Sequence, residues 1–234
     1  MSLMSKPLVR LSGVRKTFGR KTALDNAELT LNQGEILALI GDNGAGKSTL
    51  LKLITGDCLQ VFANRVRLFG QNRGAHQTLW EIRRHLGVVS HDVAAGYQKS
   101  LTALEVVCSG FFDSVGLYRY CDERQVTAAK MWLSKLDAAG LSSTPFDRLS
   151  RGQRQTVLIA RAMVKSPRLL LLDEPCAGLD GKTRKIVLQL VEKIGREENT
   201  SLIYISHRRA EIPDCTTHHL ALDRGRCSQF KVHR

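Results

Sequence analysis

Hydrophobic and polar positions alternate near the start of the chain and later give way to uninterrupted apolar runs. Residues 8–11 and 28–31 alternate, which predicts two short strands that pair in an antiparallel manner. Continuous apolar runs are typical of strands that are buried on both faces of a parallel sheet. Three such runs are Ile36–Ile40, Leu169–Leu172 and Leu202–Ile205, and two further strands are expected at Arg65–Phe69 and Leu86–Ser90.

Helical periodicity separates these strands. A helix is expected over Lys47–Ile54, ending near Gly56, and a longer one over Gly181–Glu197. From about Asp92 to Ala139 the pattern is mainly helical, most clearly over Leu104–Val107 and Gln125–Leu136. The alternation of strands and helices predicts an α/β fold with a mostly parallel sheet, together with a small antiparallel β subdomain and an inserted helical subdomain.

Composition narrows the class of protein. The chain has 234 residues, of which 43% are hydrophobic and 24% charged, which is typical of a globular domain and excludes disordered and fibrous classes. No apolar run reaches the ~18 residues of a membrane span. Residues 1–6 lack the apolar core of a signal peptide, and the six cysteines form no CxxC pair, so we expect reduced thiols.

The charge is unusual, at a formal value of +13. Such an excess favours an anionic partner, whether a nucleotide, a nucleic acid or a lipid surface. Residues 148–168 contain six basic side chains and no acid. Other basic groups have no assigned role and are expected to form a solvated face: Arg65, Arg67, Arg73, Arg83, Arg84 and the tail 224–234.

A phosphate-binding loop follows the strand Ile36–Ile40. Residues 41–48 read GDNGAGKS and match G-x-x-x-x-G-K-[ST] between a buried strand and a helix. Glycines let backbone N–H groups converge on an anion, and the helix N-terminus adds its positive dipole end. Lys47 is expected to reach the β- and γ-phosphates and Ser48 to coordinate Mg²⁺. The expected nucleotide-binding residues are Gly41, Asn43, Gly44, Ala45, Gly46, Lys47, Ser48 and Thr49.

Two adjacent carboxylates follow the apolar strand Leu169–Leu172. The carboxyl end of such a strand borders the crevice in which α/β sheets bind ligands. We expect Asp173 to hold Mg²⁺ through its water shell and Glu174 to polarise an attacking water as a general base. The alternative is a pair of solvated carboxylates at a strand end.

The segment Leu149–Gln155, LSRGQRQ, resembles the signature of ABC ATPases, which usually begins Leu-Ser-Gly-Gly-Gln. Its position between the two nucleotide motifs also resembles that family, and the resemblance extends from about Leu8 to Phe230. It implies a single ABC ATPase domain over residues 4–234, with a helical subdomain inserted at 92–165. It also implies that Ser150, Gly152 and Gln153 bind the γ-phosphate held by a second copy, in a head-to-tail dimer.

Three further positions match the family pattern one at a time. Phe18 resembles the aromatic residue that stacks on adenine, although an ordinary core or edge Phe is the alternative. Asp180, in Gly178-Leu179-Asp180, resembles the loop that crosses the dimer interface, and it also suits a helix N-cap. His207 resembles the switch histidine that contacts the γ-phosphate and Glu174.

The chain departs from the family pattern at two positions. Arg151 replaces the first glycine of the signature, and His91 stands where a glutamine normally follows the strand. His91 is expected to accept a bond from a metal-bound water but not to reproduce a glutamine amide, so coupling to a membrane partner is altered. Gln98 lies further along the chain. Residues 109–118 resemble a segment of ATP-binding proteins associated with molybdenum transport.

The resemblance implies an ATP-binding, ATP-hydrolysing subunit of an ABC transporter, an importer, driven by ATP-dependent dimerisation as a homodimer or heterodimer. Its cofactors would be ATP and Mg²⁺, its partners separate transmembrane permease subunits, and its location cytoplasmic, at the inner face of the membrane. The charge and His91 keep two alternatives open. One is a soluble ABC ATPase acting on nucleic acid or the ribosome, and the other is a regulatory module that binds ATP without turnover.

Overall fold

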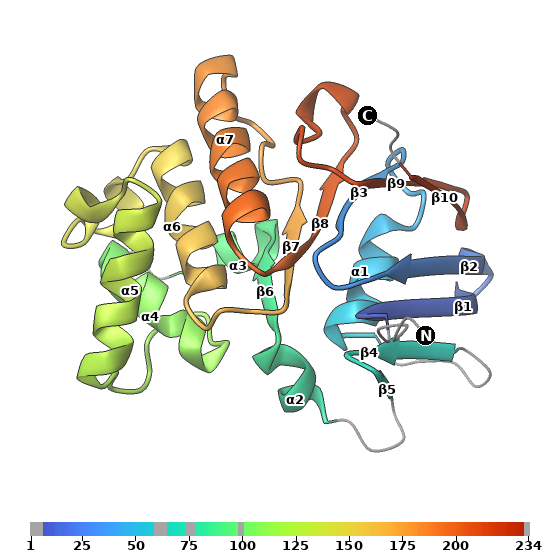
Figure 1. The fold of residues 1–234 in the computed structure, drawn as a ribbon, viewed down its shortest axis with the longest axis horizontal. Helices are drawn as coiled ribbons and strands as arrows, with labels where there is room; N and C mark the ends of the chain where they lie inside the picture. Colours follow the sequence, from blue (N-terminus) through green and yellow to red (C-terminus); the bar gives the residue numbers. More distant parts are fainter. Residues whose placement is uncertain (1–6, 59–64, 74–77, 98–100, 232–234) are drawn as a thin grey trace, which may run out of the picture. The chain divides into compact units, whose positions relative to one another are not determined.

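The computed structural model describes residues 7–58, 65–73, 78–97 and 101–231 (Figure 1). Backbone contacts divide the chain into two compact units. The first unit comprises residues 1–83 and 201–234, and the second comprises residues 84–200.

An antiparallel sheet in the first unit has the order β2-β1-β4-β5. It consists of β1 (Val9–Phe18), β2 (Lys21–Leu31), β4 (Arg65–Leu68) and β5 (Gln71–Asn72). β1 pairs antiparallel with β2, as the alternating pattern predicted, although both strands are longer than predicted. β1 also pairs antiparallel with β4, a pairing that the sequence did not predict. The alternation gives the sheet one buried face and one exposed face.

The first unit also contains strands that pair mainly in parallel. β3 (Ile36–Ile40) lies between β8 (Ser201–Ser206) and β9 (His218–Asp223), and both pairings are parallel. β10 (Arg226–Lys231) extends this part of the sheet by antiparallel pairing with β9. β3 and β8 match predicted strands, whereas β9 and β10 were not predicted.

Two α-helices lie wholly or largely among the described residues of this unit. α1 (Lys47–Thr55) follows β3 and ends at Gly56, which caps the helix with a φ of 91°. That left-handed conformation favours glycine, and a side chain at Gly56 would also displace the exposed side chain of Leu79, whose Cδ2 would lie 2.4 Å from the new Cβ. Leu79 opens α2 (Leu79–Arg84), a short helix that the sequence did not predict.

The second unit pairs two parallel strands with helices (Figure 1). Its strands are β6 (Leu86–Val89) and β7 (Leu169–Asp173), and its helices are α3 (His91–Ala95), α4 (Ala103–Ser109), α5 (Glu123–Lys135), α6 (Arg151–Met163) and α7 (Gly181–Glu197). Helices α4, α5 and α6 each begin with a reciprocal capping box, which satisfies backbone N–H groups at their first turns. The predicted helical subdomain 92–165 falls inside this unit, and its boundaries stay a prediction.

A buried arginine links the helices of the second unit. Arg161 Nε donates to Ser109 Oγ at 3.3 Å, and Arg161 Nη2 donates to the Ser114 carbonyl at 3.0 Å. Its guanidinium also lies over the Tyr97 ring, at 5.7 Å from the centroid. Arg161 therefore belongs to the core and is unavailable to a γ-phosphate. Among the described residues, no helix combines the length and apolarity that crossing a membrane requires.

Candidate nucleotide-binding site

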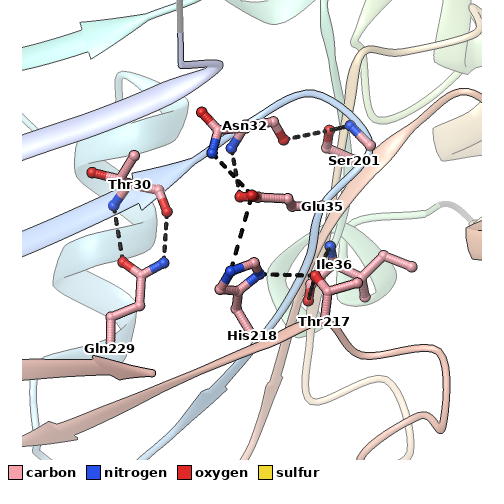
Figure 2. A network of polar contacts seen from close by, with 9 residues as sticks. Thr30, Asn32, Glu35, Ile36, Ser201, Thr217, His218 and Gln229 are labelled. Carbon is pink, nitrogen blue, oxygen red and sulfur yellow. Dashed lines mark hydrogen bonds and ion pairs between the residues drawn. The ribbon is translucent and has the colours of Figure 1, made fainter. Parts of the chain in front are cut away.

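A network of polar contacts fixes the start of β3 (Figure 2). Glu35 accepts hydrogen bonds from Asn32 N at 2.8 Å and Asn32 Nδ2 at 2.9 Å, and its Oε1 lies 3.9 Å from His218 Nε2. Thr217 Oγ1 accepts from Ile36 N and donates to Ile36 O, both at 2.9 Å. These contacts hold the strand that leads into the phosphate loop.

Two glycines of the phosphate loop stand where any side chain would collide with backbone. A Cβ at Gly41 would lie 2.4 Å from Leu222 O. A Cβ at Gly46 would lie 2.4 Å from Ala23 O, and Gly46 also has a φ of 112°. Since carbonyl groups of neighbouring strands cannot move aside cheaply, both positions require glycine for the loop to close against the sheet.

Lys47 is the most buried functional group of the loop, with 7% of its surface exposed. Its Nζ donates to Gly41 O at 2.6 Å and to Asp42 O at 3.1 Å, so the ammonium lies inside the curve of the loop. Gly225, in the turn between β9 and β10, donates its N–H to Ala45 O at 2.9 Å. The loop is thus held both by its own lysine and by a distant turn.

The N-terminus of α1 has the features of an anion-binding site. Gly46 occupies the N-cap and offers no side chain to the first N–H groups, and the first turn contains no acidic residue. The unsatisfied N–H groups and the dipole of the helix therefore favour an anion there. Asn43, Gly44 and Ser48 are exposed around this position, and Thr49 is half-buried.

Phe18 ends β1 with 52% of its surface exposed, so it is not a core residue. Lys16 Nζ lies 5.3 Å from the centroid of its ring. The ring is therefore accessible from solvent, and its predicted contact with adenine stays a prediction.

His207 follows β8 and is exposed to solvent. The turn that carries it is held from inside: Ser206 Oγ donates to Glu211 Oε2 at 3.0 Å, and Arg208 N donates to Ser206 Oγ at 3.0 Å. Ser206 and Glu211 are almost fully buried. Glu211 is a supporting residue that the sequence analysis did not identify.

In the second unit, Asp173 is the last residue of β7 and Glu174 follows it, as predicted. Both are half-buried, and Glu174 has a φ of 49°. A left-handed conformation is unusual for a side chain with a Cβ, and strained positions of this kind concentrate at functional sites. Glu174 O accepts from Ala177 N at 3.0 Å, which closes a turn directly after the carboxylate pair.

The signature segment forms the start of α6. Ser150 is the N-cap: its Oγ accepts from Gln153 N at 3.3 Å, and Gln153 Oε1 accepts from Ser150 N at 2.9 Å. Ser150 and Gln153 are exposed and Gly152 is half-buried. The N-cap interpretation and the signature interpretation therefore apply to the same residues, since an exposed, glycine-containing helix start also suits close approach of an anion.

Arg151 and Gly152 join this helix start to the loop that contains Asp180. Arg151 Nη1 donates to Gly178 O at 3.1 Å. A Cβ at Gly152 would lie only 2.3 Å from Thr183 Cγ2. The structure therefore brings the signature and the Gly178–Asp180 loop together within one unit.

Asp180 is the N-cap of α7. Its Oδ1 accepts from Lys182 N and Thr183 N, each at 3.0 Å, and its Oδ2 accepts from Thr183 Oγ1 at 2.7 Å. The backbone N–H of Thr183, followed by its hydroxyl, lowers the pKa of Asp180 below its ordinary value. The carboxylate is thereby kept ionised and fixed in direction.

His91 begins α3, immediately after the N-cap Ser90. Its predicted part in metal binding stays a prediction, and Gln98 lies outside the described residues. Across the described ranges, no group of three or more His, Cys, Asp or Glu side chains converges as a metal site. Mg²⁺ typically takes one or two protein oxygens together with substrate phosphates, so the hydroxyl of Ser48 and the carboxylate of Asp173 are donors of the right chemistry.

Comparison with known proteins assigns the family. The family model described as ABC transporter matches residues 24–177, more than half of the chain. The chain belongs to this family, and the predicted class, an ABC ATPase with an ATP-binding cassette fold, is confirmed.

Two relatives illustrate the similarity. The chain is 39% identical over 220 residues to the ABC transporter ATP-binding protein ModF of Escherichia coli (strain K12), a match that covers 92% of this chain and 44% of that relative. It is 37% identical over 212 residues to the phosphonates import ATP-binding protein PhnC of Frankia casuarinae, covering 86% of this chain and 80% of that relative. The chain thus spans less than half the length of ModF.

Solved structures show the same fold. The dimeric structure of MJ0796, a bacterial ABC transporter cassette, matches with a TM-score of 0.81 and 26% identity, covering 97% of this chain and 99% of that one. A dimeric post-hydrolysis state of MJ0796 bound to ADP and Pi matches with a TM-score of 0.80 and 27% identity, covering 97% and 99%.

Proposed function

We propose that this chain binds ATP on its phosphate loop and hydrolyses it as the motor of an ABC transporter. The observation that carries the proposal is the start of α1, a glycine-lined helix N-terminus without a side-chain cap beside the buried ammonium of Lys47. In a member of the ABC transporter family, this is the arrangement that accepts a triphosphate.

Binding exchanges contacts within the loop. The backbone N–H groups of residues 44–49 donate hydrogen bonds to the phosphate oxygens. Lys47 exchanges its hydrogen bonds to Gly41 O and Asp42 O for contacts with the β- and γ-phosphates. Ser48 and Asp173 would hold Mg²⁺, which spreads the negative charge of the phosphates. His91 would bind a water of that ion, and Phe18 would stack on the adenine.

Hydrolysis requires a base and a group that senses the γ-phosphate. Glu174 accepts a proton from the attacking water, whose oxygen bonds to the γ-phosphorus while the bond to the β–γ bridging oxygen breaks. The products are ADP and inorganic phosphate. His207 contacts the γ-phosphate and Glu174, and its turn is held in place by the buried pair Ser206–Glu211.

A second cassette completes the site in this proposal. Ser150, Gly152 and Gln153 of one copy bind the γ-phosphate held by the other, and Asp180 lies in the loop that crosses between them. The partner cassette is a second copy of the chain or a related one. Support comes from MJ0796, which is dimeric.

The transporter role extends to partners outside the chain. We propose that separate permease subunits hold the cassette at the inner, cytoplasmic face of the membrane and that the complex is an importer, as the names of PhnC and of the sulfate/thiosulfate import protein CysA state for those relatives. Residues 109–118 resemble a segment of ATP-binding proteins associated with molybdenum transport, so we propose that subgroup for this chain.

Two measurements test the proposal. Purified chain should release phosphate from ATP, and Lys47→Ala should abolish the release. A tagged chain extracted from membranes with mild detergent should carry an integral membrane protein with it. Recovery of ribosomal proteins or nucleic acid in place of a membrane protein would contradict the transporter role while leaving ATP hydrolysis intact.

A further inference from the structure

A basic depression lies on the antiparallel sheet of the first unit. Its volume is about 480 Å³. Of the described side chains that line it, none is acidic or aromatic and four are arginines. The lining residues are Arg10, Ser12, Arg65, Val66, Arg67, Asn72 and Arg73.

Strand register explains why the arginines gather there. Arg10 on β1 lies directly opposite Arg67 on β4, and Arg67 lies opposite Asn72 on β5. Ser12 and Arg65 form the next pair on the same exposed face. Two rows of polar groups therefore cross the sheet, and they are separated by two residues, or about 6.8 Å.

The rows are held rigidly at several points. Arg67 Nε donates to Asn72 Oδ1 at 2.6 Å. Opposite Arg10 on the other side is Thr30 of β2, whose backbone N–H and C=O are bonded by the side-chain amide of Gln229 at 3.0 and 2.6 Å (Figure 2). The strands that carry the arginines are thus part of a braced sheet rather than a loose loop.

Arg73 forms a fixed wall of the depression. Its guanidinium donates to the carbonyls of Leu53 at 2.7 Å, Gly56 at 3.1 Å and Cys58 at 2.6 Å. Its charge is therefore held at one place by backbone acceptors that carry no net charge, and it still adds to the positive potential of the depression.

The arginines of this depression have no direct ion-pair partner among the described residues, although burial lowers the pKa of Arg73 and the nearby carboxylate of Asp57 acts against that lowering. By contrast, Arg83 pairs with Asp57 at 2.6 Å and Arg226 with Asp25 at 3.1 Å. Like charges placed directly opposite each other on a sheet destabilise it. An arrangement that carries this cost and offers guanidinium, hydroxyl and amide groups fits an anionic ligand.

We infer that this depression binds a ligand that carries at least two linked phosphate groups. Two rows of donors about 6.8 Å apart offer separate places for two phosphates of one ligand, either neighbouring phosphates of a nucleic-acid strand or non-adjacent phosphates of a polyphosphate. Among the described residues that line the depression none has an aromatic ring to stack on a base, and the guanidinium, hydroxyl and amide groups present are donors for phosphate oxygens. Val66, the one apolar residue in the described part of the lining, is buried, whereas membrane-surface sites typically present exposed Trp, Phe or Leu, so a soluble phosphate-bearing ligand fits better than a lipid surface.

The probes are a fluorescent single-stranded oligothymidylate of about 12 nucleotides and inorganic tripolyphosphate, tested on the full chain. We expect saturable binding that survives in Lys47→Ala, because the phosphate loop is a different site. Arg10→Gln combined with Arg67→Gln should weaken binding about tenfold and reduce the magnitude of the log–log salt slope for the oligonucleotide by about 1.4, since each phosphate contact contributes about 0.7.

The control is the double variant Arg124→Gln with Lys130→Gln, at two exposed positions on α5, which removes the same amount of positive charge. It should leave the binding affinity and the salt slope nearly unchanged. Binding of the oligonucleotide that tripolyphosphate fails to displace identifies a nucleic-acid strand, and binding of tripolyphosphate alone identifies a small polyphosphate. Four results would overturn the inference: neither probe binds, both double variants behave alike, binding disappears in Lys47→Ala, or only phosphatidylserine vesicles are bound.

Discussion

The Ser206 hydroxyl donates a 3.0 Å hydrogen bond to Glu211 Oε2, and this buried pair closes the turn that carries His207. Ser206 Oγ also accepts from Arg208 N at 3.0 Å, so one hydroxyl fixes the backbone on both sides of His207. The position of the proposed γ-phosphate contact therefore depends on a carboxylate five residues away from the strand end.

Glu211→Ala should lower stability and slow ATP turnover without weakening ATP binding. Removal of the carboxylate leaves the buried Ser206 hydroxyl without its acceptor, which costs about 1–3 kcal/mol. Glu211→Gln keeps an acceptor and should recover most of both properties. Urea unfolding and phosphate release measure the two effects, and equal behaviour of the Ala and Gln variants would show that the hydrogen bond does not position His207.

Lys47→Ala should lower ATP affinity at least about tenfold, because the ammonium supplies a charge-assisted contact to the phosphates. The substitution also removes the bonds to Gly41 O and Asp42 O in the nucleotide-free chain, so the free energy of unfolding should fall by about 1 kcal/mol. Isothermal titration with ATP and denaturant unfolding separate these two quantities. Unchanged ATP affinity would remove Lys47 from the site.

Gly152→Ala should destabilise the second unit, because its Cβ would lie 2.3 Å from Thr183 Cγ2. Thr183→Ser removes that methyl group and retains the hydroxyl that binds Asp180. The double variant should therefore recover most of the loss, which we put at about 1–3 kcal/mol. Denaturant unfolding of the four proteins in the cycle tests this, and additive effects of the two substitutions would contradict the close contact.

The stability of the chain should depend on Asp180 in acid. The Thr183 N–H and hydroxyl lower the pKa of Asp180 in the folded chain, so the folded state is favoured when the pH is above the ordinary value of 3.8. That contribution is lost as the pH falls through the lowered folded-state pKa. Asp180→Asn keeps an N-cap that does not titrate. Urea unfolding from about pH 5 to about pH 3 should show a shallower loss of stability for Asp180→Asn than for the wild type. Parallel curves would contradict the prediction.

Local patterns predicted much of the fold. α7 has the predicted bounds Gly181–Glu197 and β3 the predicted bounds Ile36–Ile40, because a long amphipathic period and a short continuous apolar run are both unambiguous. α2 was missed because six residues with one buried side chain, Ile82, give no helical period. β9 alternates in burial only over its second half, and the polar sequence of β10, Arg226–Lys231, gives no strand period, so both were missed.

Contacts between segments that are far apart in the chain could not be predicted from the sequence. Thr217 joins Ile36 across 181 positions, and Gly225 supports Ala45 from the far end of the chain. No local pattern predicts such pairings. The same limit applies to Arg73, which was expected on a solvated basic face but donates to three backbone carbonyls. The motif residues were easier to predict because their spacing is local.

The most direct test of the account compares ATP binding and ATP turnover in Glu174→Gln and the wild type. Glutamine keeps the size of Glu174 but cannot take the proton of the attacking water, so turnover should fall by about 100-fold or more. ATP binding should be retained, and size-exclusion chromatography with ATP should show an accumulated dimer. Turnover at the wild-type rate, with no dimer in the presence of ATP, would contradict the role of Glu174 as the base and with it the proposed mechanism.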